Sequence, residues 1–152
     1  DIRPSRGLGD VYKRQALSRY REQAVTMLNN ALNTPNGGFS EICDYFASLS
    51  ASLEQGDRRG CLASQAAIDR AQDDPQVADI VAEIMADLRA AFASAVAVGL
   101  ARGELRELPP DDLVEFLVGL QRALATMMRT ATPADEIQRY SQVSLAMLAR
   151  PD

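Results

Sequence analysis

Hydrophobic residues recur at three- and four-residue steps along most of the chain, which is the spacing of one face of an α-helix. From Ala16 onward this pattern predicts six helices, over residues 16–33, 40–55, 61–71, 76–102, 111–130 and 133–149. Alanine and leucine dominate the composition, and aromatic residues make up only 5% of it. Pattern and composition together predict an all-α helical bundle.

Turn and capping residues divide these helices. Asp74-Pro75 pairs an N-cap residue with a proline at the first helical position, and Gly103 is a typical stop signal. At the last helix we expect Thr132 to act as the cap, with Pro133 at the first helical position and Asp135 placed for a capping box.

The last two helices carry an apolar surface that is too wide for one contact. We therefore expect them to form half of an intermolecular four-helix bundle with a second copy, although a hairpin packed wholly against its own domain remains an equal alternative at this point. The expected interface residues are Leu113, Phe116, Leu117, Leu120, Leu124, Met128, Ile137, Tyr140, Ser141, Ser144 and Leu148.

Residues 1–15 differ from the remainder of the chain. They contain two glycines, a proline and the only lysine, and they lack helical periodicity. The string GDVYKRQ looks like translated adapter sequence at the end of an assembled reading frame, so we expect a foreign leader that is disordered or loosely docked. The alternative is a genuine basic arm. The domain proper is expected over residues 16–150.

The charge is unevenly distributed. Of 16 basic and 21 acidic residues, six basic and three acidic ones lie within residues 1–22. Residues 23–152 therefore carry 10 basic and 18 acidic residues, a net charge of −8. Because phosphate repels so acidic a body, we expect no direct contact between this region and nucleic acid.

The residue types exclude most catalytic chemistry. The chain has no histidine, and its two cysteines, Cys43 and Cys61, lack the spacing of a zinc site. No phosphate-binding glycine motif is present either. We expect a protein that is not an enzyme, uses no cofactor or metal and, since it has no signal peptide or long uninterrupted apolar run, is cytoplasmic.

Several polar residues lie on helix faces that are otherwise apolar, which is the usual composition of a small-molecule pocket. For each residue taken singly, an ordinary role in helix packing is the simpler interpretation. The expected pocket residues are Tyr45, Phe46, Leu49, Cys61, Leu62, Gln65, Ile84, Leu88, Phe92, Gln121 and Met127.

Five motifs in order carry a resemblance to a known family. They are LSRYREQ at 17–23, GCL at 60–62, DDPQV at 73–77, GLARGEL at 99–105 and FLVGLQRALATMMRTATPADEI at 116–137. In this order and spacing, the chain resembles the effector-binding half of the TetR/AcrR family of bacterial transcriptional regulators.

The resemblance implies a dimer whose last two helices form the interface and whose middle helices enclose a small apolar or amphipathic effector. Residues 16–33 would be the connector to DNA-reading helices, so that effector binding controls release of operator DNA. The helix-turn-helix head of that family has no counterpart in this sequence, and we therefore expect a regulator fragment that does not read DNA. The rival hypothesis is a free-standing helical dimer with a structural or interaction role and no effector.

Overall fold

The computed structural model describes residues 5–34, 37–56 and 71–152, and within them the chain forms five helices. They are α1 (Ser5–Leu32), α2 (Phe39–Glu54), α4 (Pro75–Ala101), α5 (Pro110–Arg129) and α6 (Ala134–Ala146). The prediction of an all-α fold is confirmed. The helix predicted over residues 61–71 lies outside the described residues except for Ala71, which is in a turn.

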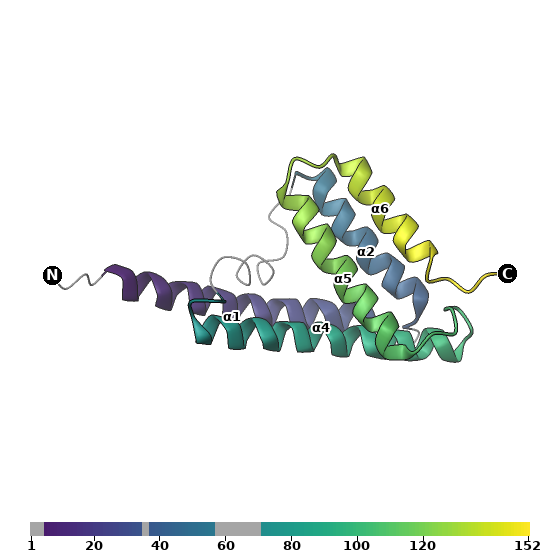
Figure 1. Cartoon of the computed structure of the whole chain (residues 1–152), viewed down its shortest axis with the longest axis horizontal. Coiled ribbons are helices and arrows are strands. Elements are labelled where there is room, and N and C mark those ends of the chain that lie inside the picture. The colour runs from purple at the N-terminus through teal and green to yellow at the C-terminus, as the bar shows by residue number, and fades with distance from the viewer. Residues whose placement is uncertain (1–4, 35–36, 57–70) are drawn as a thin grey trace.

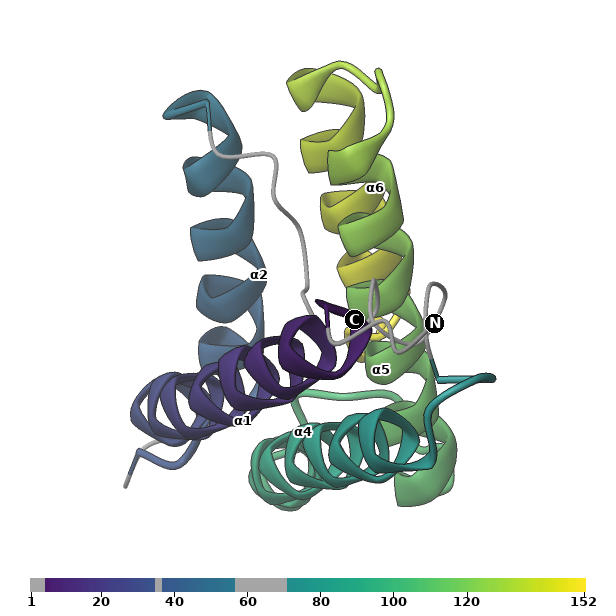
Figure 2. The same ribbon diagram turned by 90° about the vertical axis from the view of Figure 1, so that its left-hand side faces the viewer.

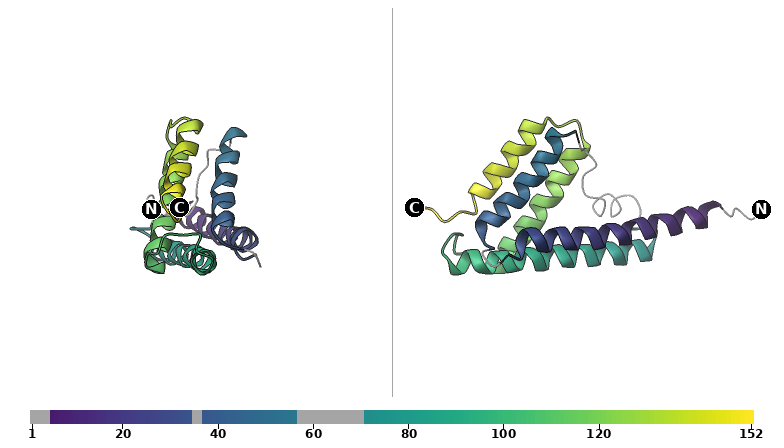
Figure 3. Two further views of the ribbon diagram at one scale, coloured as in Figure 1. Left: turned by 90° about the vertical axis from the view of Figure 1, so that its right-hand side faces the viewer. Right: turned by 180° about the vertical axis from the view of Figure 1, so that it is seen from behind.

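The helices form two layers. The long helices α1 and α4 lie side by side, and α2, α5 and α6 stand on them as a second layer (Figure 1). Seen end-on, α2 lies on one side of the α5–α6 pair, and no other described helix covers the opposite side (Figure 2 and Figure 3, left).

Apolar side chains hold the first layer together, and ion pairs flank them. Leu17 and Leu28 of α1 and Val81 and Ile84 of α4 are all buried in the core. Beside this core, the Arg21 guanidinium bonds both Glu83 and Asp87, with 2.9 Å between Nε and the Asp87 oxygen. The hydrogen bond to Asp87 is the main cause of a raised pKa for Arg21, which keeps this group charged.

The helix α1 begins at Ser5, whereas the sequence predicted a start at Ala16 and no helix before it. Leu8, Val11 and Tyr12 of this extension are exposed. The segment therefore has no buried apolar face, in agreement with the lack of helical periodicity in the sequence, and it is helical nevertheless. Residues 12–24 are rich in strong helix formers, and local propensity can extend a helix without a buried face. Whether residues 1–15 belong to the native protein stays a prediction.

A compact clamp joins the start of α2 to the loop after α4. The Phe39 amide donates to Glu104 Oε2 at 2.9 Å, and the Gly38 amide donates to Glu41 Oε2 at 2.7 Å. Gly103, with φ of 69°, lets the chain turn so that Glu104 reaches this position. The same loop pairs with the C-terminus through a bridge between Leu105 and Ala149.

The predicted cap of α4 is confirmed, and that of α6 is wrong. Asp74 Oδ1 accepts from the amides of Gln76 and Val77 at 3.0 and 3.3 Å. At α6, Pro133 itself occupies the N-cap position and no side chain caps the helix. The Thr132 hydroxyl instead forms a hydrogen bond of 2.7 Å with the Thr130 hydroxyl, since both residues lie in the turn after α5.

The helix α4 is the one described helix that is long and apolar enough to cross a membrane, judged by length and composition alone. In the fold α4 contacts α1, α2 and α5, and ten of its residues are buried. This is the burial expected of the central helix of a globular core.

Candidate functional site

Three aromatic rings of the predicted pocket pack together between α2 and α4. Phe46 and Phe92 are stacked with their ring centres 5.7 Å apart, and Tyr45 meets both edge-on. Phe46 and Phe92 are wholly buried, and Ile84 and Leu88 are buried on the same face of α4. These residues serve the core; their contact with a ligand stays a prediction.

Gln121 is the polar residue of α5 that the fold leaves unsatisfied. Its Oε1 atom is buried and accepts no hydrogen bond. A buried acceptor without a donor costs about 1–3 kcal/mol of stability, so a donor supplied from elsewhere would be favourable. Leu49 and Met127 of the predicted pocket are half-buried beside the core. Cys61, Leu62 and Gln65 lie outside the described residues.

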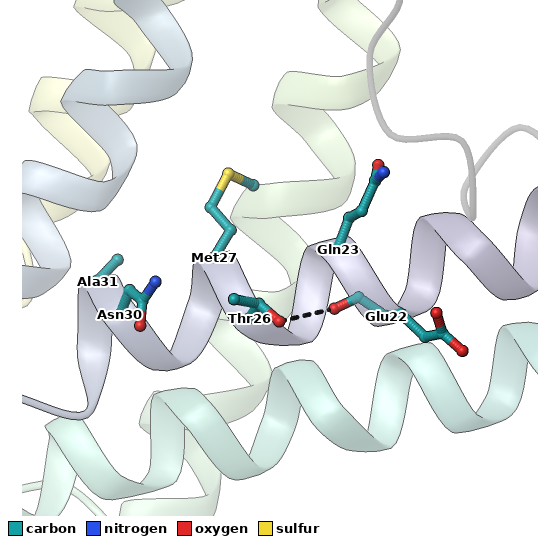
Figure 4. Close-up of a pocket in the computed structure, with 6 residues that line it drawn as sticks. All are labelled: Glu22, Gln23, Thr26, Met27, Asn30 and Ala31. Atoms are coloured by element: carbon teal, nitrogen blue, oxygen red, sulfur yellow. Dashed lines mark hydrogen bonds between the residues drawn. The ribbon is translucent and has the colours of Figure 1, made fainter.

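A shallow pocket lies along α1, and the Glu22 side chain at one end of it is directed toward α4 (Figure 4). Its volume is about 680 Å³, and its described lining is Glu22, Gln23, Thr26, Met27, Asn30 and Ala31. Met27 and Gln23 project away from α4 (Figure 4). The sequence analysis missed this pocket because a polar helix face normally indicates solvent, and nothing in the pattern distinguishes it.

Met27 carries the clearest sign that this face is unusual. Met27 is 56% exposed. In the sequence it belongs to a row of mainly apolar residues at helical spacing, which would normally be buried. Methionine is flexible and polarisable and adapts to ligands of irregular shape. We therefore include the α1 face, which we call the α1 pocket, among the candidate sites.

A second groove of about 470 Å³ separates α2 from α6. Cys43, Ser50, Ser141 and Leu145 are among its lining residues. Burial raises the pKa of the Cys43 thiol, and the neighbouring Asp44 carboxylate raises it further. The thiolate is therefore disfavoured near neutral pH, and Cys43 lacks the activation that a nucleophile needs.

The predicted interface residues fall into two groups. Nine of the eleven are buried within a single chain, whereas Phe116 and Tyr140 are 42% and 45% exposed. The buried side chains already serve the protomer's own core, so a second copy would have to use the neighbouring surface. The buried nine are Leu113, Leu117, Leu120, Leu124, Met128, Ile137, Ser141, Ser144 and Leu148.

That neighbouring surface is apolar. Val143 of α6 and Met147, the residue that caps the end of α6, are 54% and 61% exposed, and they follow Tyr140 at three- and four-residue steps. On α5, Phe116 is followed at the same steps by Gly119 and Ala123. Each row lies next to a row of buried residues on its own helix. We call these six residues the outer face.

Within the described residues, no group of three or more histidine, cysteine, aspartate or glutamate side chains is placed to hold a metal ion. Among the described residues, the ion pairs between helices that perturb pKa values join α1 and α5 to α4, so they serve to hold the helices together. The main cause of the lowered pKa of Glu115, for example, is its hydrogen bond with Arg89 of α4.

The comparison with protein families agrees with this architecture. A family model described as Tetracyclin repressor-like, C-terminal domain, matches residues 38–143. Neither the curated proteins nor the solved structures include a match to this chain. The match spans more than half of the chain and covers α2, α4, α5 and most of α6, so the protein belongs to the Tetracyclin repressor-like family through its C-terminal domain.

Proposed function

We propose that the chain is the effector-binding and dimerisation part of a transcriptional regulator, in which two copies associate through the outer face. Membership of the Tetracyclin repressor-like family supports a regulatory domain of this general kind. The single observation that carries the proposal is the outer face itself.

The outer face supports association because large apolar side chains gather there. Phe116, Tyr140, Val143 and Met147 are each more than 40% exposed. An exposed row of large apolar side chains, such as Tyr140, Val143 and Met147, is typical of a surface that contacts another molecule. A two-fold dimer brings the same patch of both copies together, and an apolar patch is complementary to itself.

Small residues on α5 would allow this contact to be close. A Cβ atom built at Gly119 meets no atom within 4 Å, so the space outside α5 is open at that point. Ala123 follows one turn later on the same row. A helix of the second copy could therefore approach the α5 backbone, with the larger side chains packing on either side.

Dimerisation is tested by placing charge on this face. The double variant Phe116→Glu/Val143→Glu should elute as a monomer in size-exclusion chromatography with light scattering, whereas the unmodified chain should show the mass of two chains. The matched control is Ala97→Glu, an exposed alanine on α4, which should stay dimeric. A double variant that remains a dimer with unchanged circular dichroism would contradict the proposal.

Leu120→Glu serves as a second comparison. Because Leu120 is 3% exposed within one chain, this change should unfold the protomer instead of releasing a folded monomer. A folded monomeric Leu120→Glu variant would place the contact on the buried row and not on the outer face.

The regulatory part of the proposal concerns the α1 pocket. All six described lining residues belong to α1, the helix whose residues 16–33 resemble the family's connector to the DNA-reading helices. A small apolar or amphipathic effector bound there would act directly on that helix and change the geometry available for operator binding. A structural dimer without an effector remains the rival function, and the lack of any ligand for this pocket would favour it.

A further inference from the structure

We propose that the groove between α2 and α6 is a separate ligand site, and that it takes a small neutral amphiphile whose polar end both donates and accepts hydrogen bonds. The inference goes beyond the proposed function, because the described lining of this groove shares no residue with the α1 pocket or the outer face. Three features support it: the depth of the groove, the hydroxyl of Ser141, and the absence of a basic residue from the described lining.

The groove has a buried floor and an exposed rim. Its floor is formed by Ser50 of α2 and by Ser141 and Leu145 of α6, each of which is 7% exposed or less. Two helices thus enclose a space of about 470 Å³, which lies within the range of about 300–1,000 Å³ that is usual for ligand sites. The exposed rim consists of Asp44, Ala47, Gln142 and Ala146.

The Ser141 hydroxyl has an unused hydrogen-bonding capacity at this floor. Ser141 is 3% exposed, and within residues 5–34, 37–56 and 71–152 its side chain forms no hydrogen bond. A serine in a helix commonly donates to the carbonyl four residues earlier, as Ser144 does to the Tyr140 oxygen at 2.7 Å. Because a buried hydroxyl without a partner is unfavourable, a ligand that supplies one gains affinity.

Ser50 provides another hydroxyl from the opposite helix. It donates to the Phe46 carbonyl oxygen over a long distance of 3.4 Å, and its own oxygen can still accept a hydrogen bond. A carboxamide suits both hydroxyls, because its carbonyl oxygen accepts from Ser141 and its NH₂ group donates to Ser50. Leu145 and the half-buried Phe39 supply apolar surface for a short hydrocarbon chain.

The charges of the groove disfavour an ionic ligand. In the described lining Asp44 is the one charged residue, and it lies at the exposed rim. A charged group at the floor would therefore lose hydration without gaining a counter-charge. The net charge of −8 on residues 23–152 acts further against anions. A neutral polar end is the chemistry that remains.

The test compares four small molecules of similar size, each titrated into the intact chain while amide chemical shifts are recorded. Hexanamide is the expected ligand and should shift amides of residues 43–50 and 138–146. Heptan-2-one replaces the NH₂ group by a methyl group and should bind more weakly. Hexanoate and hexylammonium carry a negative and a positive charge at the same end, and they should bind most weakly.

Two serine variants identify the hydroxyl. Ser141→Ala should weaken hexanamide binding about two- to tenfold, the effect of losing one hydrogen bond. The matched control is Ser144→Ala, which removes a hydroxyl of the same helix that is also buried but is bonded within α6. This control should leave the affinity unchanged.

Several results would overturn the proposal. They are the absence of hexanamide shifts in residues 43–50 and 138–146, equal effects of the two serine variants, and binding of either ion as tightly as hexanamide. If hexylammonium alone bound as tightly, the Asp44 carboxylate and not the hydroxyl floor would determine the ligand. None of these results would bear on dimerisation, which is measured separately through the outer face.

Discussion

Single side chains hold the start of α2 against the loop after α4. Glu104 accepts the first free amide of α2, and Gly38 leaves room for it, since a Cβ at position 38 would lie 2.7 Å from the Glu104 carboxylate oxygen. Arg102 lies 3.8 Å from the other oxygen of the same carboxylate. The GLARGEL motif thus has a structural role at this clamp.

Replacing Glu104 should therefore weaken the fold. Glu104→Ala removes the acceptor of the Phe39 amide and should lower the free energy of unfolding by about 1–2 kcal/mol, the usual cost of losing such a cap. Urea denaturation monitored by circular dichroism measures the change. Glu107→Ala is the control, because the Glu107 side chain is 81% exposed and pairs with Arg150 instead of with the clamp. Similar losses in the two variants would show that the clamp does not stabilise the protein.

At the scale of elements, a glycine can leave room where another segment lies close to a helix. Gly99 of α4 lies against the clamp loop, where a Cβ would come 2.9 Å from Leu105 Cδ1 and 3.5 Å from the Phe39 amide nitrogen. A Cβ built at Gly119 of α5, by contrast, meets no atom within 4 Å. Close packing therefore explains the glycine at position 99, whereas the surroundings of Gly119 within the protomer would accept a larger residue.

The corresponding alanine variants should change stability in opposite directions. Gly119→Ala should raise the free energy of unfolding by about 0.5–1 kcal/mol through helix propensity alone. Gly99→Ala should lower it by about 1–3 kcal/mol, because Leu105 would have to move in a packed core. Both are measured by denaturation in the Phe116→Glu/Val143→Glu background, so that association does not contribute. A destabilising Gly119→Ala would mean that α5 is covered within the protomer.

At the scale of the whole molecule, net charge limits the partners. The chain has a net charge of −5, and its excess of basic residues is confined to residues 1–22. This distribution is unfavourable for phosphate contact by residues 23–152.

The chain by itself should not bind duplex DNA at physiological salt. Fluorescence anisotropy with a labelled duplex should stay flat at micromolar protein, because the acidic body gains no counterion release from phosphate contacts. A lysine-rich peptide under the same conditions provides the positive control. A saturable rise that weakens steeply with salt would show that the basic segment is sufficient for DNA binding.

Helix positions could be predicted well from the sequence, for local reasons. The predicted ranges of α2, α4 and α5 each differ from the structure by one residue at either end, because the Asp74 cap, Gly103 and the paired prolines act within a few residues. The C-terminal end of α6 was predicted too late: the chain leaves the helix at Ala146, since residues 148–150 pair with residues 104–106. That pairing is distant in sequence and leaves no periodic signal.

The sequence by itself determined that this protein is helical, where α2, α4 and α5 lie, and which helix faces are apolar, since periodicity is a property of each helix alone. Only the tertiary structure decided which neighbour covers each apolar face. It placed Leu113, Leu120 and Leu124 inside the protomer, left Phe116 and Val143 outside, and turned Met27 toward open space. The reason is geometric: a row of apolar residues specifies that a contact exists, but the partner depends on how distant segments pack.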